Sequence, residues 1–129
     1  MKVVVAGAGY AGTLAANRIA KKVSGTEITI INPRPEFVER VRLHQQAAGT
    51  GKAATPLAKM LHEGVRSRTA AVEKIGDGSV TLGDGEVLDF DFLILAVGST
   101  LSPLPGTVPI GTWEGAEQAR EKLANLTAG

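Results

Sequence analysis

Three glycines near the amino terminus have the spacing of a phosphate-binding turn. The run Lys2–Ala6 is almost wholly apolar and rich in valine, which is typical of a strand buried on both faces of a parallel sheet. It is followed at once by Gly7-x-Gly9-x-x-Gly12 and then by a helical pattern. In that context such glycines permit a tight turn, a close backbone approach to a pyrophosphate, and close helix–strand packing. The positive end of the helix would face the anion. The alternative is a glycine-rich turn without a ligand.

A second candidate position stands at the end of the next predicted strand. The residues at 27–31, rich in isoleucine, predict a second strand, and Asn32 follows it, twenty residues past Gly12. A carboxylate usually stands there and accepts hydrogen bonds from the adenosine ribose. Asn32 keeps an acceptor oxygen without the charge, so it could still bind a ribose, with Arg34 near a phosphate or the adenine. Alternatively, the lost anion and Arg34 could favour a 2′-phosphate, and hence NADP. Asn32 and Pro33 could also form only a turn.

Hydrophobic periodicity places these turns in an α/β fold. We predict a helix over 13–22, which completes a right-handed β-α-β unit, and a further buried parallel strand over 91–97. Residues 65–75, 79–82 and 86–88 predict a three-stranded antiparallel meander, because Asp-Gly pairs separate these strands. Further helices are expected over 36–48, from Thr55 and Pro56 to Gly64, and over 114–126, whereas 100–112 is expected to be loop. The prediction is a parallel sheet of about three to four strands with helices on its faces.

Composition excludes several function classes. The 129-residue chain has the length of one domain, and a net charge of +1 with 4% aromatic residues argues against nucleic-acid binding. The absence of cysteine excludes disulfides and a thiol nucleophile, and the histidines at 44 and 62 are too scattered to predict a metal site. No signal peptide and no apolar run of about 18 residues is present, so we expect no transmembrane segment and a cytoplasmic location. The sequence assigns no catalytic residue.

Four segments, in order, resemble the flavoprotein pyridine-nucleotide oxidoreductases that have two dinucleotide-binding domains. Residues 3–12 resemble the FAD fingerprint, and 43–57 resemble the loop after the second strand in type II NADH dehydrogenases and their relatives. Residues 70–99 resemble the meander with the second flavin-contact motif, and 114–126 resemble the connection into the NAD(P)H domain. The resemblance is to the type II NADH dehydrogenase and apoptosis-inducing-factor-like group. It implies a Rossmann-like FAD/NAD(P)-binding domain.

The resemblance also implies a set of cofactor-binding residues. The backbone amides of residues 8–12 would hold the FAD pyrophosphate, and Val72 would lie where relatives bind the adenine edge. Residues 96–98 would pass beneath the pyrophosphate and the ribityl chain, and Arg42 would fall in a loop that approaches the flavin. The complete set of expected cofactor-binding residues is Gly7, Ala8, Gly9, Tyr10, Ala11, Gly12, Asn32, Arg34, Arg42, Val72, Ala96, Val97 and Gly98.

The function implied by the resemblance is that of the FAD-binding portion of an NAD(P)H-dependent oxidoreductase. Hydride would pass through flavin to a quinone or another acceptor, and the lack of cysteine excludes dithiol chemistry. We expect an incomplete FAD-binding domain at 1–112 and, at 113–129, a linker helix to an absent NAD(P)H domain, so that this chain alone is inactive. Exposed strand edges would favour self-association, and the full-length protein could lie at the inner face of a membrane. The alternatives are a stand-alone NAD(P)- or ADP-binding module with a regulatory role, or an inactive fragment.

Overall fold

The computed structural model describes residues 1–126, which fall into two compact units. The first unit comprises residues 1–37 and 55–98, and the second comprises residues 38–54 and the chain from residue 99 onward. Residues 127–129 of the expected linker helix lie outside the described residues. The expected domain boundary between residues 112 and 113 stays a prediction.

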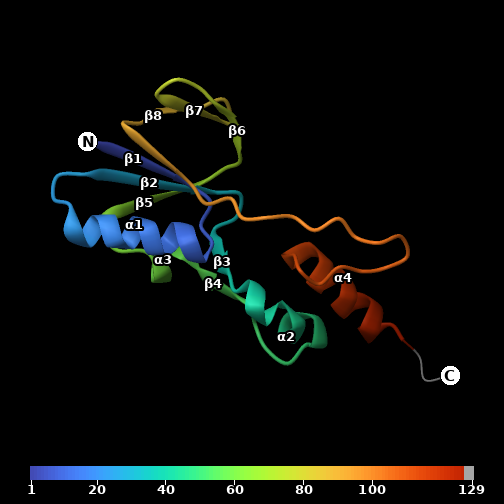
Figure 1. Ribbon diagram of the computed structural model, residues 1–129. Coiled ribbons are helices and arrows are strands. Elements are labelled where there is room, and N and C mark those ends of the chain that lie inside the picture. The colour runs from blue at the N-terminus through green and yellow to red at the C-terminus, as the bar shows by residue number, and fades with distance from the viewer. Residues whose placement is uncertain (127–129) are drawn as a thin grey trace. The chain divides into compact units, whose positions relative to one another are not determined.

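A four-stranded parallel sheet forms the centre of the first unit (Figure 1). Its strands are β1 (Lys2–Ala6), β2 (Glu27–Asn32), β5 (Val65–Thr69) and β9 (Phe92–Leu95), in the order β5-β2-β1-β9. Each neighbouring pair is parallel. The apolar run of the central strand β1 is buried, as the sequence predicts, because other elements cover both faces of the sheet.

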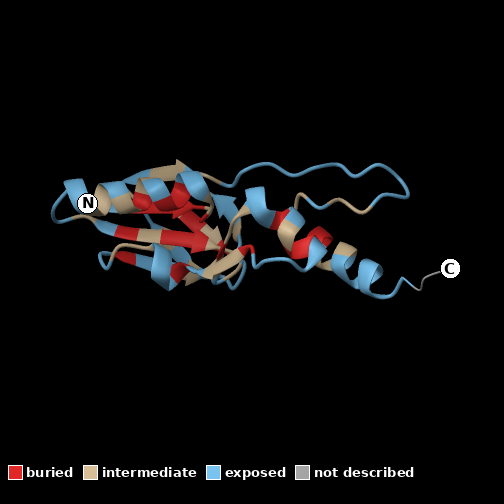
Figure 2. Cartoon of the chain, turned by 90° about the horizontal axis from the view of Figure 1, so that it is seen from below, coloured by how far each residue is buried: buried red, intermediate tan, exposed pale blue. Residues whose placement is uncertain are grey.

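Opposite faces of this sheet are covered by different structures. On one face, Val3, Val5 and Ile30 pack with Ala16 of helix α1 (Tyr10–Lys22) and with Leu57 of the short helix α3 (Leu57–Met60). The alternate residues of the strands point to the other face, where Val4 and Ile31 pack with Val80 and Leu82. These partners belong to a three-stranded antiparallel sheet of β6 (Val72–Ile75), β7 (Ser79–Leu82) and β8 (Val87–Asp89). Figure 2 shows the buried residues along the sheet and on the side of α1 next to it.

The prediction that the meander begins at Val65 is wrong. Val65–Thr69 pairs with β2 in the parallel sheet, and the meander begins only at Val72. As an edge strand, β5 exposes Arg66 and half-buries Arg68 while it buries Val65. Because only Val65 of β5 is buried, its sequence lacks the apolar run that is typical of a central parallel strand.

The predicted helices of the middle segment also need correction. Residues 36–48 form β3 (Glu36–Val38), the 3-10 helix η1 (Arg40–Arg42) and α2 (Leu43–Ala48) instead of one helix. Their neighbour β4 (Ala54–Pro56) pairs with β3, so Thr55 and Pro56 lie in a strand and the next helix begins at Leu57. This pairing supplies backbone hydrogen-bond partners that local periodicity does not reveal.

The second unit has a small core of its own. Its buried residues Leu43, Ala47, Ala53 and Ala116 bring α2 against α4 (Trp113–Ala124). The hydroxyl oxygen of Thr112 accepts a hydrogen bond from the Gly115 N–H at 3.1 Å and caps α4. The guanidinium of Arg40 donates to the carbonyl oxygens of Ser99 and Gly111, which holds both ends of the loop before α4. None of the described helices has the length and apolar character needed to cross a bilayer.

Candidate nucleotide-binding site

The strand order reverses next to β1, which creates a topological switch point at the carboxyl ends of the central strands. From β1 the parallel sheet grows through β2 to β5 on one side, and β9 returns to the other side of β1. Ligands of open α/β sheets bind at the carboxyl ends of strands where the order reverses in this way. Here β1 and β9 continue into Gly7 and Ala96, and the Ala96 N–H donates to the Ala6 carbonyl oxygen at 2.8 Å.

The three glycines of the turn have different surroundings. Gly7 has a φ of +101°, and a Cβ there would lie 2.3 Å from the Ala96 carbonyl oxygen. A Cβ at Gly12 would lie 1.9 Å from the Gly7 carbonyl oxygen. At Gly9, by contrast, a Cβ would meet nothing within 4 Å. Gly7 and Gly12 are therefore required by backbone packing, whereas Gly9 borders open space.

Helix α1 begins beside that open space. Its first intrahelical hydrogen bond runs from the Thr13 N–H to the Gly9 carbonyl oxygen at 3.0 Å. The amides of Tyr10, Ala11 and Gly12 therefore have no acceptor within the helix. No side chain caps this end, and its first turn has no acidic residue. These free amides and the positive end of the helix dipole together favour the binding of an anion at the start of α1.

Asn32 connects the glycine-rich turn to the turn that follows β2. Its Oδ1 accepts from the Ala8 N–H at 3.1 Å, and its Nδ2 donates to the Arg34 carbonyl oxygen at 2.8 Å. The Ala8 amide, one of those expected to face a pyrophosphate, is thus occupied within the protein. The sequence indicates Asn32 as a ribose ligand but does not reveal that its side chain also shapes the turn.

A cavity of about 280 Å³ lies next to Asn32. Its lining residues are Ala6, Gly7, Ile31, Asn32, Pro33, Ala70, Ala71, Val72 and Val97. Among the described residues, none that lines it carries a charged side chain. An apolar wall with one oriented polar side chain is usual for a small-molecule site, and the volume is slightly below the range of about 300–1,000 Å³ for drug-sized ligands. The cavity therefore suits one nucleoside rather than a whole dinucleotide.

The structure brings several of the expected site residues to this cavity. Gly7, Asn32, Val72 and Val97 line it together. Gly98 follows with a φ of +73°, which glycine adopts without strain.

Other expected residues lie elsewhere or act through the backbone. Arg34 contributes its carbonyl oxygen to Asn32. Arg42 belongs to the second unit, where its Nε lies 3.8 Å from a Glu39 carboxylate oxygen. The ring of Tyr10 packs edge-on against Phe37 at 5.1 Å between centroids.

Sequence reasoning missed part of the cavity wall. Ala70 and Ala71 lie between β5 and β6, and both line the cavity. The Ala70 N–H donates to the Asn32 carbonyl oxygen at 3.0 Å, which continues the pairing of β5 with β2. Recognition of Val65–Thr69 as a parallel strand would have located both alanines at the carboxyl edge of the sheet.

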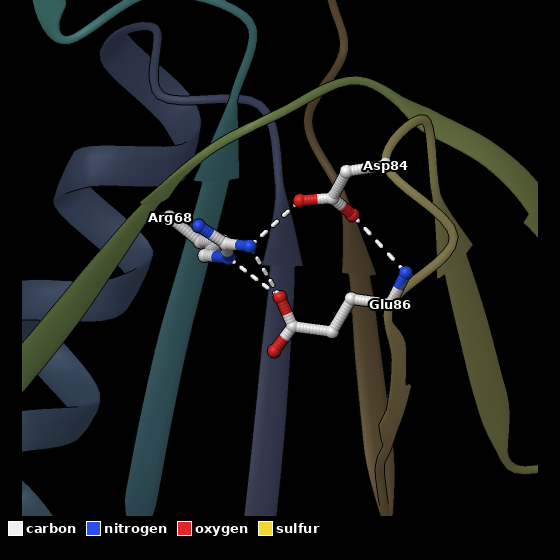
Figure 3. Close-up of polar contacts among 3 residues, drawn as sticks. All are labelled: Arg68, Asp84 and Glu86. Atoms are coloured by element: carbon white, nitrogen blue, oxygen red, sulfur yellow. Dashed lines mark hydrogen bonds and ion pairs between the residues drawn. The ribbon is translucent and has the colours of Figure 1, made fainter.

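A larger cavity of about 360 Å³ lies at the amino ends of the strands, where Lys2 and Glu27 are among its lining residues. At its border, Arg68 of β5 donates from Nη2 to Asp84 at 2.7 Å and from Nε to Glu86 at 2.7 Å (Figure 3). The hydrogen bond that Arg68 donates to the Glu86 carboxylate, helped by the negative charges of Glu86 and Asp84, raises the pKa of the Arg68 guanidinium. These charges satisfy one another, so the cluster connects β5 to the β7–β8 turn. Within residues 1–126, no group of three or more His, Cys, Asp or Glu side chains could hold a metal ion.

Comparison with known proteins identifies the family. Residues 1–127 match the family described as pyridine nucleotide-disulphide oxidoreductase. The chain belongs to this family. Its members are FAD-dependent oxidoreductases that use NAD(P)H, so the resemblance inferred from the sequence is confirmed.

Individual relatives agree with this membership. The type II NADH:quinone oxidoreductase of Staphylococcus epidermidis is 36% identical over 104 residues, which are 75% of this chain and 26% of that protein. The enzyme of the same name from Staphylococcus aureus is 35% identical over equal shares. The chain therefore spans about 26% of the length of these relatives.

Solved structures confirm the Rossmann-like fold. The sulfide:quinone oxidoreductase of Aquifex aeolicus superposes with a TM-score of 0.83 at 26% identity, over 95% of this chain and 31% of that one. NDH2 of Plasmodium falciparum, solved in complex with NADH, has a TM-score of 0.78 at 19% identity, over 94% and 28% of the two chains. At that identity the second likeness concerns the fold alone.

Proposed function

We propose that the crevice at the carboxyl ends of β1, β2 and β9 binds the ADP half of FAD, and that the chain is the flavin-binding part of an NAD(P)H-dependent oxidoreductase. One observation carries the proposal. The backbone at Ala96, just after β9, closes on Gly7, which also lines a neutral cavity, while Gly9 at the start of α1 borders open space. Other turn glycines, such as Gly25 and Gly85, also border open space, but among them only Gly9 precedes a long helix whose first amides lack acceptors and follows a residue pair that lines a neutral cavity.

The residues present fit this cofactor. The amides of Tyr10, Ala11 and Gly12 would hold the pyrophosphate, because they lack acceptors within the helix. Asn32 would bind the ribose, and the apolar wall at Ala71 and Val72 would receive the adenine. Bound FAD supplies hydride and electron transfer at its flavin ring, whereas this chain supplies binding and orientation.

The names of the relatives support a proposal for the electron acceptor, and the chemistry of that acceptor supports one for the location. The names of the Staphylococcus and Aquifex proteins include a quinone as acceptor. A quinone is therefore the acceptor we propose for the whole protein, with NAD(P)H as hydride donor. Since quinones are apolar, the protein would work at the inner face of a membrane as a peripheral protein, with its remaining surface in the cytoplasm.

Flavin binding by the purified chain tests the proposal. We expect FAD to co-elute with the chain and, at about 100 times its Kd, to stabilise it by about 2.7 kcal/mol in a thermal melt. Stabilisation by NADP⁺ but not by FAD would instead support the stand-alone nucleotide-binding module. If neither nucleotide binds, the proposal fails.

Substitution of Gly9 locates the binding site. Gly9→Val fits into open space and should leave the fold intact, yet its side chain would occupy the approach to the amides of α1. We expect the Kd for FAD to rise by at least about tenfold in calorimetry. The matched control is Gly76→Val, in the β6–β7 turn, where a Cβ would come no closer than 3.4 Å to Ser79 Oγ. Equal FAD affinity in the two variants would place the cofactor elsewhere.

A further inference from the structure

The two hydrogen bonds of the Asn32 side chain require a group that both accepts and donates, as an amide does. Ala8 presents an N–H to it at 3.1 Å, and Arg34 presents a carbonyl oxygen at 2.8 Å. An ionised carboxylate accepts hydrogen bonds but donates none. Aspartate at this position would keep the bond from Ala8 but would face the Arg34 carbonyl oxygen with a second acceptor. Because one partner is a donor and the other an acceptor, they favour asparagine over aspartate at position 32.

The same choice removes charge from the adenosine end of the crevice. In dinucleotide-binding folds a carboxylate at this position bonds the ribose 2′-hydroxyl. A carboxylate also repels a phosphate group at the same place, because both are anions. Here the residue is neutral, and the cavity beside it has no charged residue among the described residues that line it.

Asn32 also keeps hydrogen-bonding capacity for a ligand of either kind. An amide has two N–H donors and two acceptor lone pairs, of which the bonds to Ala8 and Arg34 use one each. The remaining N–H can donate to a phosphate oxygen, and the remaining lone pair can accept from a hydroxyl. Resting on the proposed nucleotide site, we infer that this crevice does not discriminate against a 2′-phosphate and binds adenosine dinucleotides with and without that group.

NAD⁺ and NADP⁺ are suitable probes, because they differ only in the 2′-phosphate. For the unaltered chain we expect Kd values within about threefold of each other by calorimetry. In Asn32→Asp the Kd for NADP⁺ should rise at least about tenfold relative to that for NAD⁺. Asn32→Ala loses both internal hydrogen bonds without adding charge, so it should weaken both ligands and leave their ratio unchanged. A preference of the unaltered chain for NAD⁺ above about thirtyfold would overturn the inference.

A second variant guards against misfolding of Asn32→Asp. Ala71 is exposed at the rim of the cavity, so Ala71→Asp adds a carboxylate without touching the bonds of Asn32. We expect Ala71→Asp to weaken the binding of NADP⁺ selectively. Ala71→Asn, whose side chain has the shape of aspartate without the charge, should leave the ratio of the Kd values for NADP⁺ and NAD⁺ unchanged. An unchanged ratio in every folded aspartate variant would show that charge at this end does not set specificity.

The outcomes separate this inference from the proposed function. FAD has no 2′-phosphate, so its binding is measured independently. If FAD binds but NADP⁺ is strongly rejected, only the inference fails. If NAD⁺ and NADP⁺ bind equally but FAD does not, only the flavin function fails. Failure of all three nucleotides to bind would overturn both.

Discussion

Gly12 lies so close to the backbone of Gly7 that a Cβ at this position would overlap with it. The distance from such a Cβ to the Gly7 carbonyl oxygen would be 1.9 Å, and the neighbouring atom belongs to backbone that cannot rotate away. The glycine at Gly9 has no such neighbour. Two glycines of one motif therefore have separable roles, one in packing and one in access.

Alanine substitutions should separate these roles. Gly12→Ala must shift α1 from the turn, so we expect a loss of about 3 kcal/mol in the free energy of unfolding, measured by urea denaturation. Gly9→Ala meets no atom and has an ordinary φ of −80°, so its stability should change by less than about 1 kcal/mol. Equal stability of the two variants would contradict the packing role of Gly12.

At the scale of elements, Arg68 connects two layers that otherwise meet through apolar contacts. It belongs to β5 of the parallel sheet, while Asp84 and Glu86 belong to the turn region between β7 and β8. Just beyond β5, Ala70 and Ala71 line the cavity. The ion pairs thus help to hold the meander over the strand whose continuation forms the nucleotide site.

Removal of Arg68 should weaken the fold in a salt-dependent manner. Arg68→Met should lower the urea midpoint, and the difference from the unaltered chain should shrink as salt is added, because these charges are partly exposed. Arg66→Met is the control, since Arg66 has one well-exposed pair with Glu27. Its effect should be smaller.

The pH dependence has a defined sign. Because the pKa of Arg68 is raised, its contribution is complete below the unfolded-state pKa and is lost only as pH rises through the folded-state pKa. No part of the loss of stability in acid should therefore come from Arg68 itself.

In the salt experiment, a larger effect of Arg66→Met than of Arg68→Met, or no dependence on salt, would contradict the stabilising role of the Arg68 ion pairs.

At the scale of the whole molecule, β9 is an edge strand of the described sheet, and it exposes apolar side chains. Phe92 and Leu95 are 60% and 62% exposed, and only β1 pairs with β9 within residues 1–126. Exposed, flat apolar edges are sites at which chains pair with one another.

We therefore expect this chain to self-associate as its concentration rises, as measured by analytical ultracentrifugation. Leu95→Lys should reduce the association, because a charged edge opposes strand pairing. The control Leu126→Lys changes a residue that is 72% exposed beyond α4 and should have little effect. A monomer at every concentration would refute the expectation.

The local sequence determined the elements that carry their own pattern. The run Lys2–Ala6 is apolar because β1 is buried on both faces of the sheet, whereas Phe92–Leu95 is an apolar run although β9 is only partly buried. The glycine spacing between β1 and α1 follows from backbone contacts of Gly7 and Gly12. The family was also identifiable from these motifs. Only the tertiary structure decided that Val65–Thr69 joins the parallel sheet and that Glu36–Val38 is a strand. It likewise decided that Asn32 bonds to Ala8 and that Ala71 completes the cavity. These features depend on partners distant in the chain, and a periodic pattern reports the burial of each residue but not the identity of its partner.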